Sequence, residues 1–227
     1  MPSGRRHAEV WSPLYQAGRA AVIGWAKAFN GLAVAGRGNI PDDRGCLVVC
    51  NHLADSDGMY LGAALPKPPR IVTHLVTGRH HDGSRIARAV MLRLGLEPVG
   101  ADGGVVAALR HCRRVLRDGG IVVIYPEGVP GYSARGQRFA EGVGWLALTP
   151  GIDVVPAAIW GSQGVARHGV PIGRGPVRVA FGARIPMDGV GDARVQRVRE
   201  ATRRSQARVQ RLVVALATVE AARPGAT

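Results

Sequence analysis

Residues that can carry acid–base chemistry follow a short apolar run near residue 50. The run CLVVC spans 46–50, and Asn51, His52, Asp55 and Asp57 come directly after it. A neutral imidazole can take a proton from a hydroxyl when a carboxylate holds its other ring nitrogen. Asp57 can fold back onto His52 across a tight turn. The segment therefore predicts that His52 acts as a general base oriented by Asp57.

A second segment repeats this arrangement of an apolar run followed by a polar loop. The run IVVIY spans 121–125, and Glu127 and Gly128 come after it, with Arg135 and Arg138 further along the chain. In open parallel sheets, ligands bind in the crevice beyond the carboxyl ends of the strands. Both polar loops are therefore expected to line one shared cleft.

The chain of 227 residues is 46% hydrophobic, which fits a single domain with one substantial core. Its apolar runs lack polar alternation, as is typical of strands buried on both faces. Segments with apolar residues three and four apart lie between them and predict crossover helices. The fold class expected is an α/β single-domain sandwich, a mostly parallel central sheet flanked by helices. The expected strands are 46–50, 71–76, 121–125, 153–160 and 177–181, and the expected crossover helices are 84–94 and 104–116.

Long helices are expected at both ends of the chain. Ser12 and Pro13 supply a cap and a first-turn proline for an N-terminal amphipathic helix from Leu14 to about Ala35. Its aromatic and basic residues suit either contact with a lipid interface or packing over the core, and both interpretations stay open. A last helix after Asp192 has one apolar face and one arginine-rich face, which suits either solvent or anionic lipid.

The charge balance points to anionic partners. Thirty Lys and Arg against sixteen Asp and Glu give a formal net charge of +14. No secretory signal is recognised at the N-terminus, and no uncharged run is long enough to span a bilayer as a helix. Three cysteines without a CxxC pair suit buried thiols in a reducing compartment, so a cytoplasmic location is expected.

The motifs resemble those of a known family. NHLADSD, from Asn51 to Asp57, matches the NHxxxxD signature of the glycerolipid acyltransferases related to lysophosphatidate acyltransferase. YPEG at 125–128 resembles the family's FPEG block, RFAEGVGWLAL resembles the helix that follows it, and VVPAAIWG at 154–161 resembles a proline-containing fourth block. The order and spacing of the blocks agree from about residue 40 to residue 161.

This resemblance implies transfer of a fatty acyl group from acyl-CoA or acyl carrier protein to a hydroxyl of a lysophospholipid or related lipid. His52 and Asp57 would be catalytic, and neither a metal nor a cofactor would be needed. An acyltransferase domain would span 40–227, and the tail and amphipathic helix at 1–39 would contact an anionic membrane at its inner, cytoplasmic face. The expected substrate-binding residues are Asn51, Glu127, Gly128, Arg135 and Arg138.

Two departures from the family pattern concern the acceptor. Alignment from Gly95 places Ala101 where the family's second block has an arginine, and Pro130 follows Val129 where Thr and Arg are usual. Alanine and proline offer no charge to a phosphate. An acceptor other than lysophosphatidate is therefore expected.

The same residues also fit functions other than acyl transfer. A metal-dependent hydrolase could combine His52, Asp55 and Asp57 with the cluster His80, His81 and Asp82, and a catalytically silent protein could bind membranes or anionic ligands. A serine hydrolase is disfavoured because Ser133 lacks the expected elbow motif. Nucleic acid is not expected as a partner, because aromatic residues make up only 5% and no recognised fingerprint is present.

Overall fold

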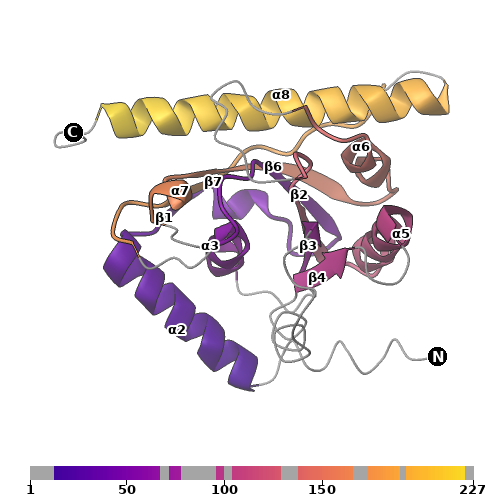
Figure 1. Cartoon of the computed structure of the whole chain (residues 1–227). Coiled ribbons are helices and arrows are strands. Elements are labelled where there is room, and N and C mark those ends of the chain that lie inside the picture. Colours follow the sequence, from indigo (N-terminus) through magenta and orange to yellow (C-terminus); the bar gives the residue numbers. More distant parts are fainter. Residues whose placement is uncertain are drawn as a thin grey trace.

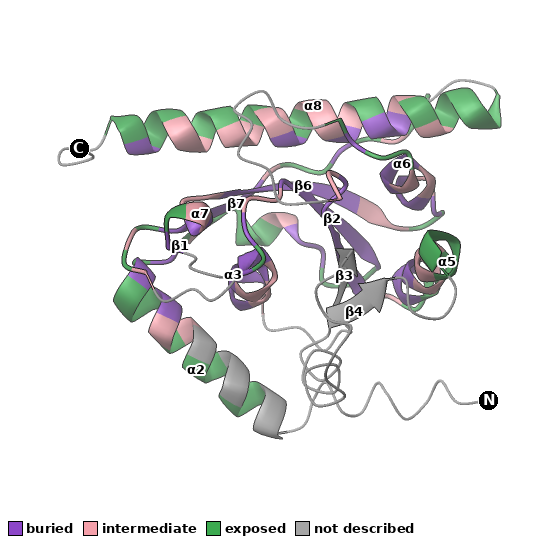
Figure 2. Ribbon diagram, in the orientation of Figure 1, coloured by how far each residue is buried: buried purple, intermediate pink, exposed green. Residues whose placement is uncertain are grey.

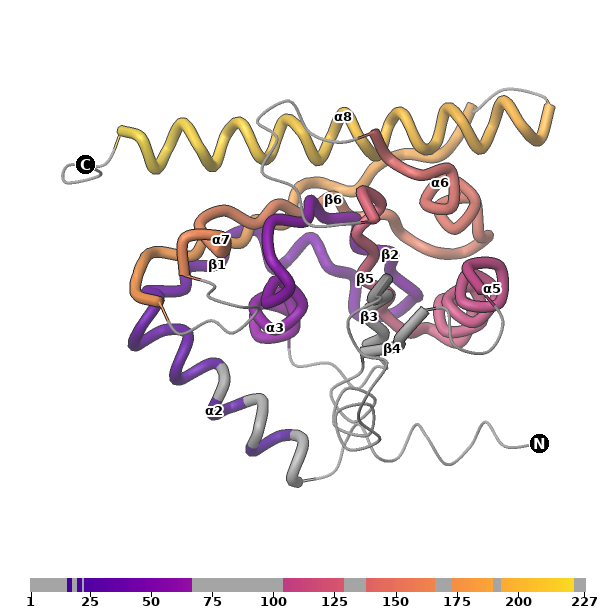
Figure 3. Tube along the Cα trace, in the orientation of Figure 1, coloured from indigo at the N-terminus to yellow at the C-terminus, as the bar shows by residue number. Residues whose placement is uncertain are grey.

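The computed structural model describes residues 13–66, 72–77, 96–99, 104–128, 138–165, 173–189 and 193–222, and Figures 1 and 3 trace their course. In chain order the elements are α2 (Pro13–Asn30), β1 (Ala33–Ala35), the short 3-10 helix η1 (Arg37–Asn39), β2 (Cys46–Cys50), α3 (Asp57–Ala64), β3 (Val72–Thr77), β4 (Leu96–Val99), α5 (Gly104–Arg117), β5 (Ile121–Ile124), α6 (Gly142–Ala147), β6 (Asp153–Trp160), α7 (Ser162–Val165), β7 (Arg178–Phe181) and α8 (Arg194–Ala221).

The strands form one mixed sheet in the order β1-β7-β6-β2-β5-β3-β4. All neighbours pair in parallel except β6 and β7, which are antiparallel, so β1 and β7 run opposite to the other strands. The expectation of a mostly parallel sheet is confirmed. Because β2, β3, β4, β5 and β6 share one direction, their carboxyl ends meet at one edge of the sheet.

Helices cover both faces of the sheet (Figure 1). Along β2, Val48 packs with residues of α2 and α3, whereas Leu47 and Val49 pack with residues of α5, α6 and α8. This alternation follows from the two-residue period of a strand. Every side chain of β2 and β5 is buried, and Figure 2 shows β2 in the colour of buried residues. This burial explains why these runs contain no polar residue. The single α/β sandwich expected from the sequence is confirmed.

The N-terminal helix is shorter than the sequence suggested. It begins at Pro13 but ends at Asn30, and Gly31 then adopts a φ of +48, a left-handed conformation that commonly follows a helix. The next residues form β1, which pairs with β7 at an edge of the sheet. The prediction of helix to about Ala35 was therefore wrong. The predicted helix at 84–94 lies outside the described residues.

The last helix, α8, lies along the outside of one face of the sheet and contacts α6 and β6. Near its end, the carboxylate of Glu220 accepts a hydrogen bond from Arg178 of β7 at 2.8 Å, and both side chains are largely buried. The same guanidinium donates to the carbonyl of Gly31. No described helix is both long enough and apolar enough to cross a bilayer.

The close approach of α6 to α8 depends on Gly144. A Cβ atom at this position would collide with the Val198 carbonyl oxygen and the Thr202 hydroxyl of α8. We expect Gly144→Ala to destabilise the fold by about 1–3 kcal/mol, since a main-chain atom must move. Gly24→Ala is the matched control, because nothing lies within 4 Å of a Cβ there and the change favours helix. Urea unfolding of both variants measures the difference, and equal stability would contradict this packing.

Candidate active site

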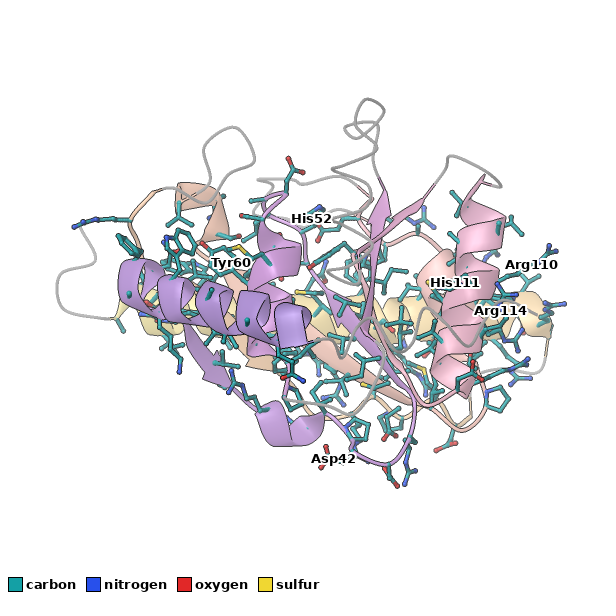
Figure 4. The ribbon with its side chains drawn as sticks, turned by 90° about the horizontal axis from the view of Figure 1, so that it is seen from below. Asp42, His52, Tyr60, Arg110, His111 and Arg114 are labelled. Atoms are coloured by element: carbon teal, nitrogen blue, oxygen red, sulfur yellow. The ribbon has the colours of Figure 1, made fainter. Side chains whose placement is uncertain are left out.

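His52 lies directly after β2, at the sheet edge where the parallel strands end (Figure 4). The strand is central, with β6 on one side and β5 on the other. Asp42, in the loop that precedes β2, lies at the opposite end of the molecule in the same view. The sequence-predicted base therefore occupies the crevice edge where ligands of parallel sheets bind.

The carboxylate of Asp57 contacts three nitrogen atoms of the neighbouring turn. Its Oδ2 atom is 2.9 Å from His52 Nδ1, and it accepts main-chain hydrogen bonds from Leu53 at 2.6 Å and Ala54 at 3.0 Å. Asp57 is fully buried and is the first residue of α3, where the helix dipole favours negative charge. The predicted contact between His52 and Asp57 is present.

The imidazole is also held on its face. The ring of Tyr125, the residue after β5, stacks on His52 with ring centroids 4.5 Å apart and an interplanar angle of 22°. When Nδ1 donates to Asp57, Nε2 carries the lone pair, and the His52 side chain retains 14% exposure. The imidazole is thus orientated by two neighbours while its second nitrogen is available to accept a proton.

Asn51 connects the ends of β2 and β6. Its side-chain amide donates to the carbonyl of Ile159 at 3.0 Å and accepts from the Ile159 N–H at 2.9 Å. This pair of hydrogen bonds extends the pairing of the two strands beyond Cys50. The contact fixes the main chain just before His52, and substrate binding by Asn51 stays a prediction.

Glu127 comes from the loop after β5 and reaches the same place. Its Oε2 accepts a hydrogen bond from the His52 main-chain N–H at 3.4 Å. Burial raises the pKa of this carboxyl, and the nearby Asp57 adds to the effect, whereas the hydrogen bond from His52 opposes it. The two polar loops predicted to share a cleft are therefore in contact.

The other reactive side chains near His52 are held neutral. Burial, followed by the charges of Asp57 and Glu127, raises the pKa of the Cys50 thiol well above its usual value. Burial and Asp57 raise the pKa of Tyr60 to about 12, and its hydroxyl donates to Asn30 at 2.8 Å. Burial likewise raises the pKa of Tyr125. A protonated, buried thiol is a poor nucleophile, so burial disfavours a nucleophilic role for Cys50.

The remaining predicted residues lie partly outside the described chain. Gly128 closes the loop by donating its N–H to the Tyr125 carbonyl at 3.2 Å. Arg138 is exposed, and it stands two residues before Ala140, whose N–H donates to the Pro126 carbonyl. Arg135, Ala101 and Pro130 are outside the described residues.

A metal site gains no support from the residues that can be placed. Asp55 is exposed, whereas Asp57 is buried and directs Oδ2 to His52 and two main-chain N–H groups. Within the described ranges, no group of three His, Cys, Asp or Glu side chains is arranged to hold a metal ion. The cluster at residues 80–82 lies outside those ranges.

Sequence reasoning missed two contacts of the site. The sequence places Tyr125 at the end of a predicted strand and in the YPEG motif but indicates no contact with His52, and it predicts that Asn51 binds substrate. Both contacts join residues from different strands, so no local pattern predicts them. An aromatic residue at the end of the strand that precedes Glu127 was the only available signal for the stack on His52.

An imidazole that contacts a buried carboxylate at the end of a central strand is an arrangement that can accept a proton from a hydroxyl. The acyltransferase family model matches residues 31–160, which include β1, the site and β6. The chain therefore belongs to the acyltransferase family.

The fold also resembles a solved acyltransferase. The 1-acyl-sn-glycerophosphate acyltransferase PlsC of Thermotoga maritima aligns with a TM-score of 0.58 and 18% identity, over 90% of this chain and 86% of that one. Among curated proteins, the uncharacterized proteins Rv0502 of Mycobacterium tuberculosis and Mb0514 of Mycobacterium bovis are 30% identical over 149 residues, or 60% of this chain. The aligned region spans 39% of those relatives.

The raised pKa of Glu127 predicts a pH-dependent stability difference. Because its pKa is raised on folding, the Glu127 carboxyl binds a proton more tightly in the folded protein than in the unfolded protein. As the pH rises above 4.5, the ordinary pKa of a glutamate, the carboxylate becomes charged more readily in the unfolded protein, and the free energy of unfolding falls. Glu127→Gln keeps an oxygen acceptor for His52 and removes that titration. Its stability relative to wild type should increase from about pH 4.5 toward neutral pH in urea unfolding. A pH-independent difference would contradict burial of the charge.

Proposed function

We propose that this acyltransferase moves a fatty acyl chain from a thioester to a lipid hydroxyl, with His52 as general base. The observation that carries the proposal is the 2.9 Å contact between His52 Nδ1 and the buried carboxylate of Asp57. That contact leaves Nε2 to receive a proton, and the site lies at the edge of the sheet where a substrate can enter.

The reaction uses one proton carrier. His52 Nε2 removes the proton from the acceptor hydroxyl as its oxygen attacks the thioester carbonyl carbon. The new C–O bond gives a tetrahedral intermediate, and its collapse breaks the C–S bond. The imidazolium returns the proton to the leaving sulfur, which departs as a thiol. Asp57 stabilises the imidazolium throughout by accepting from Nδ1–H. No acyl-enzyme is formed, consistent with the protonated Cys50.

The donor in this proposal is acyl-CoA or an acylated carrier protein, and the acceptor is a lysophospholipid or a related lipid with a free hydroxyl. In this proposal, the residues that bind the acceptor are Glu127, Gly128, Arg135 and Arg138. Support for this assignment comes from the contact of Glu127 with the His52 main chain. Asn51 holds the strand ends beneath the substrates through Ile159.

We place the enzyme at the inner face of the membrane, as a peripheral protein of the cytoplasm. Helix α2 supplies the contact, because Phe29 is 48% exposed and stacks with Trp25 at 6.0 Å. Amphipathic helices with aromatic residues of this kind lie in lipid interfaces. The positive charge of the chain adds attraction to anionic lipid.

His52→Ala should lower acyl transfer by about 100- to 10,000-fold, because the general base is removed. Asp57→Asn should also lower kcat, since an amide cannot stabilise the imidazolium in the same way. The assay is thiol release from palmitoyl-CoA, or from the palmitoylated carrier protein, with a panel of lysolipid acceptors. Asp55→Asn is the matched control, because Asp55 is exposed two residues away. Transfer by His52→Ala at the wild-type rate with every productive donor would sink the mechanism.

A second experiment tests whether the acceptor lipid must carry a phosphate. Because Ala101 and Pro130 replace the cations that the family commonly uses, a phosphate on the acceptor should add little to kcat/KM. Turnover of lysophosphatidate and of phosphate-free hydroxylated lipids should therefore agree within about tenfold. Strict dependence on the phosphate monoester would show that other residues of the site supply its anchor.

A further inference from the structure

One side of the molecule carries arginines that have no counter-ion among the described residues. Helix α5 contains four arginines and no acidic residue, and the first turn of α8 adds two more. We call these side chains the α5 basic face. They are Arg110, Arg113, Arg114, Arg117, Arg194 and Arg197.

The members of this face come from two helices, α5 and α8, and one of them also contacts α6. Arg113 lies over the ring of Trp145 in α6, 4.7 Å from its centroid. Burial, followed by the charges of Arg117 and Arg194, lowers the pKa of Arg113, because like charges disfavour its charged form. Glu141, the acidic residue at the start of α6, pairs instead with Arg199. An anionic partner would relieve this repulsion.

Some of the other described arginines are already paired with acidic side chains. In the middle of α8, Arg203 and Arg204 both pair with Glu200 and hold the pKa of that carboxyl at about 2. Arg204 also donates to the main-chain carbonyls of Pro186 and Asp188. A surface depression lined by Arg199, Glu200, Arg203 and Arg204 is therefore lined by side chains that already form ion pairs, in contrast to the α5 basic face.

The position of this face favours a soluble partner over a bilayer. Helix α2 packs with the core cluster on one side of the sheet, whereas α5 packs with the cluster on the other side. A flat membrane cannot contact the outer surfaces of both layers of a sandwich at once. If α2 meets lipid, the α5 basic face points toward the cytoplasm.

The same face reaches the catalytic edge. Because α5 follows β4, its first turn lies at the edge where the parallel strands end, and there Val105 and Val106 are each 59% exposed. Figure 4 shows Arg110 and Arg114 further along the outer side of α5. Exposed apolar residues beside arginines that have no acidic partner in the described part of the chain suit contact with an acidic protein surface. A row of such cations exceeds what one small nucleotide would contact.

We propose that the α5 basic face docks an acidic acyl carrier protein, which delivers its thioester on a flexible arm to His52. This inference rests on the proposed function and selects a protein carrier as the donor. Electrostatic attraction would steer the carrier to α5, and Val105 and Val106 would add apolar contact.

The test compares two double charge reversals of equal size. Arg110→Glu with Arg114→Glu alters the face, and Arg208→Glu with Arg211→Glu is the control, on exposed residues about 20 Å along α8 from Arg194. With a palmitoylated carrier protein, the first pair should raise KM by about tenfold or more and leave kcat within about twofold. With palmitoyl-CoA, both pairs should resemble wild type.

An equal KM effect on both donors, or none on the carrier, overturns the docking proposal. Loss of binding to vesicles of phosphatidylglycerol and phosphatidylcholine, or to duplex DNA, with carrier binding intact would assign the face to that anion instead. Carrier binding is followed by fluorescence anisotropy, which needs no turnover and so separates docking from the His52 mechanism. If the Glu variant fails to fold, Arg110→Gln with Arg114→Gln gives the same comparison.

Discussion

The buried carboxylate of Asp57 is the constraint that shapes the site. An ionised carboxylate removed from water is costly unless donors surround it. Here the turn after β2 supplies the main-chain N–H groups of Leu53 and Ala54, and His52 supplies a third contact to the same oxygen. The turn, the start of α3 and the imidazole are therefore fixed together, and a change at this one oxygen would disturb all three.

The central position of β2 explains how neighbouring strands hold this turn. On one side, Asn51 bonds to Ile159 at the end of β6. On the other side, the His52 N–H reaches Glu127 after β5, and Tyr125 covers the imidazole ring. An edge strand would have a neighbour on one side only. Placing the base after a central strand thus limits the movement of a loop that would otherwise be free, which suits a group that must meet a substrate at a defined distance.

The sequence predicted most of what is local or periodic. The apolar runs around Val48 and Val123 identified strands because both faces of the sheet are covered, and the spacing of His52 and Asp57 predicted their contact across one turn. It did not predict β1 or the antiparallel pairing of β7, because three or four residues carry too little pattern to show direction. The pair of hydrogen bonds between Asn51 and Ile159 joins residues 108 positions apart in the chain, so only the folded sheet reveals it.

The distribution of charge is a further property that composition conceals. The net charge of +14 indicates that the chain as a whole attracts anions, but it does not show where on the surface the positive charge lies. In the structure, Glu200 pairs with arginines in the middle of α8 and Glu220 pairs with Arg178 at the start of β7, whereas α5 contains no acidic residue. Under the proposed function, lipid meets the α2 side, the carrier meets the α5 side, and the thioester and hydroxyl converge at the sheet edge between them. Two substrates of such different size and solubility can then approach His52 without competing for one surface, which is what direct transfer without an acyl-enzyme requires, since both must be bound at once.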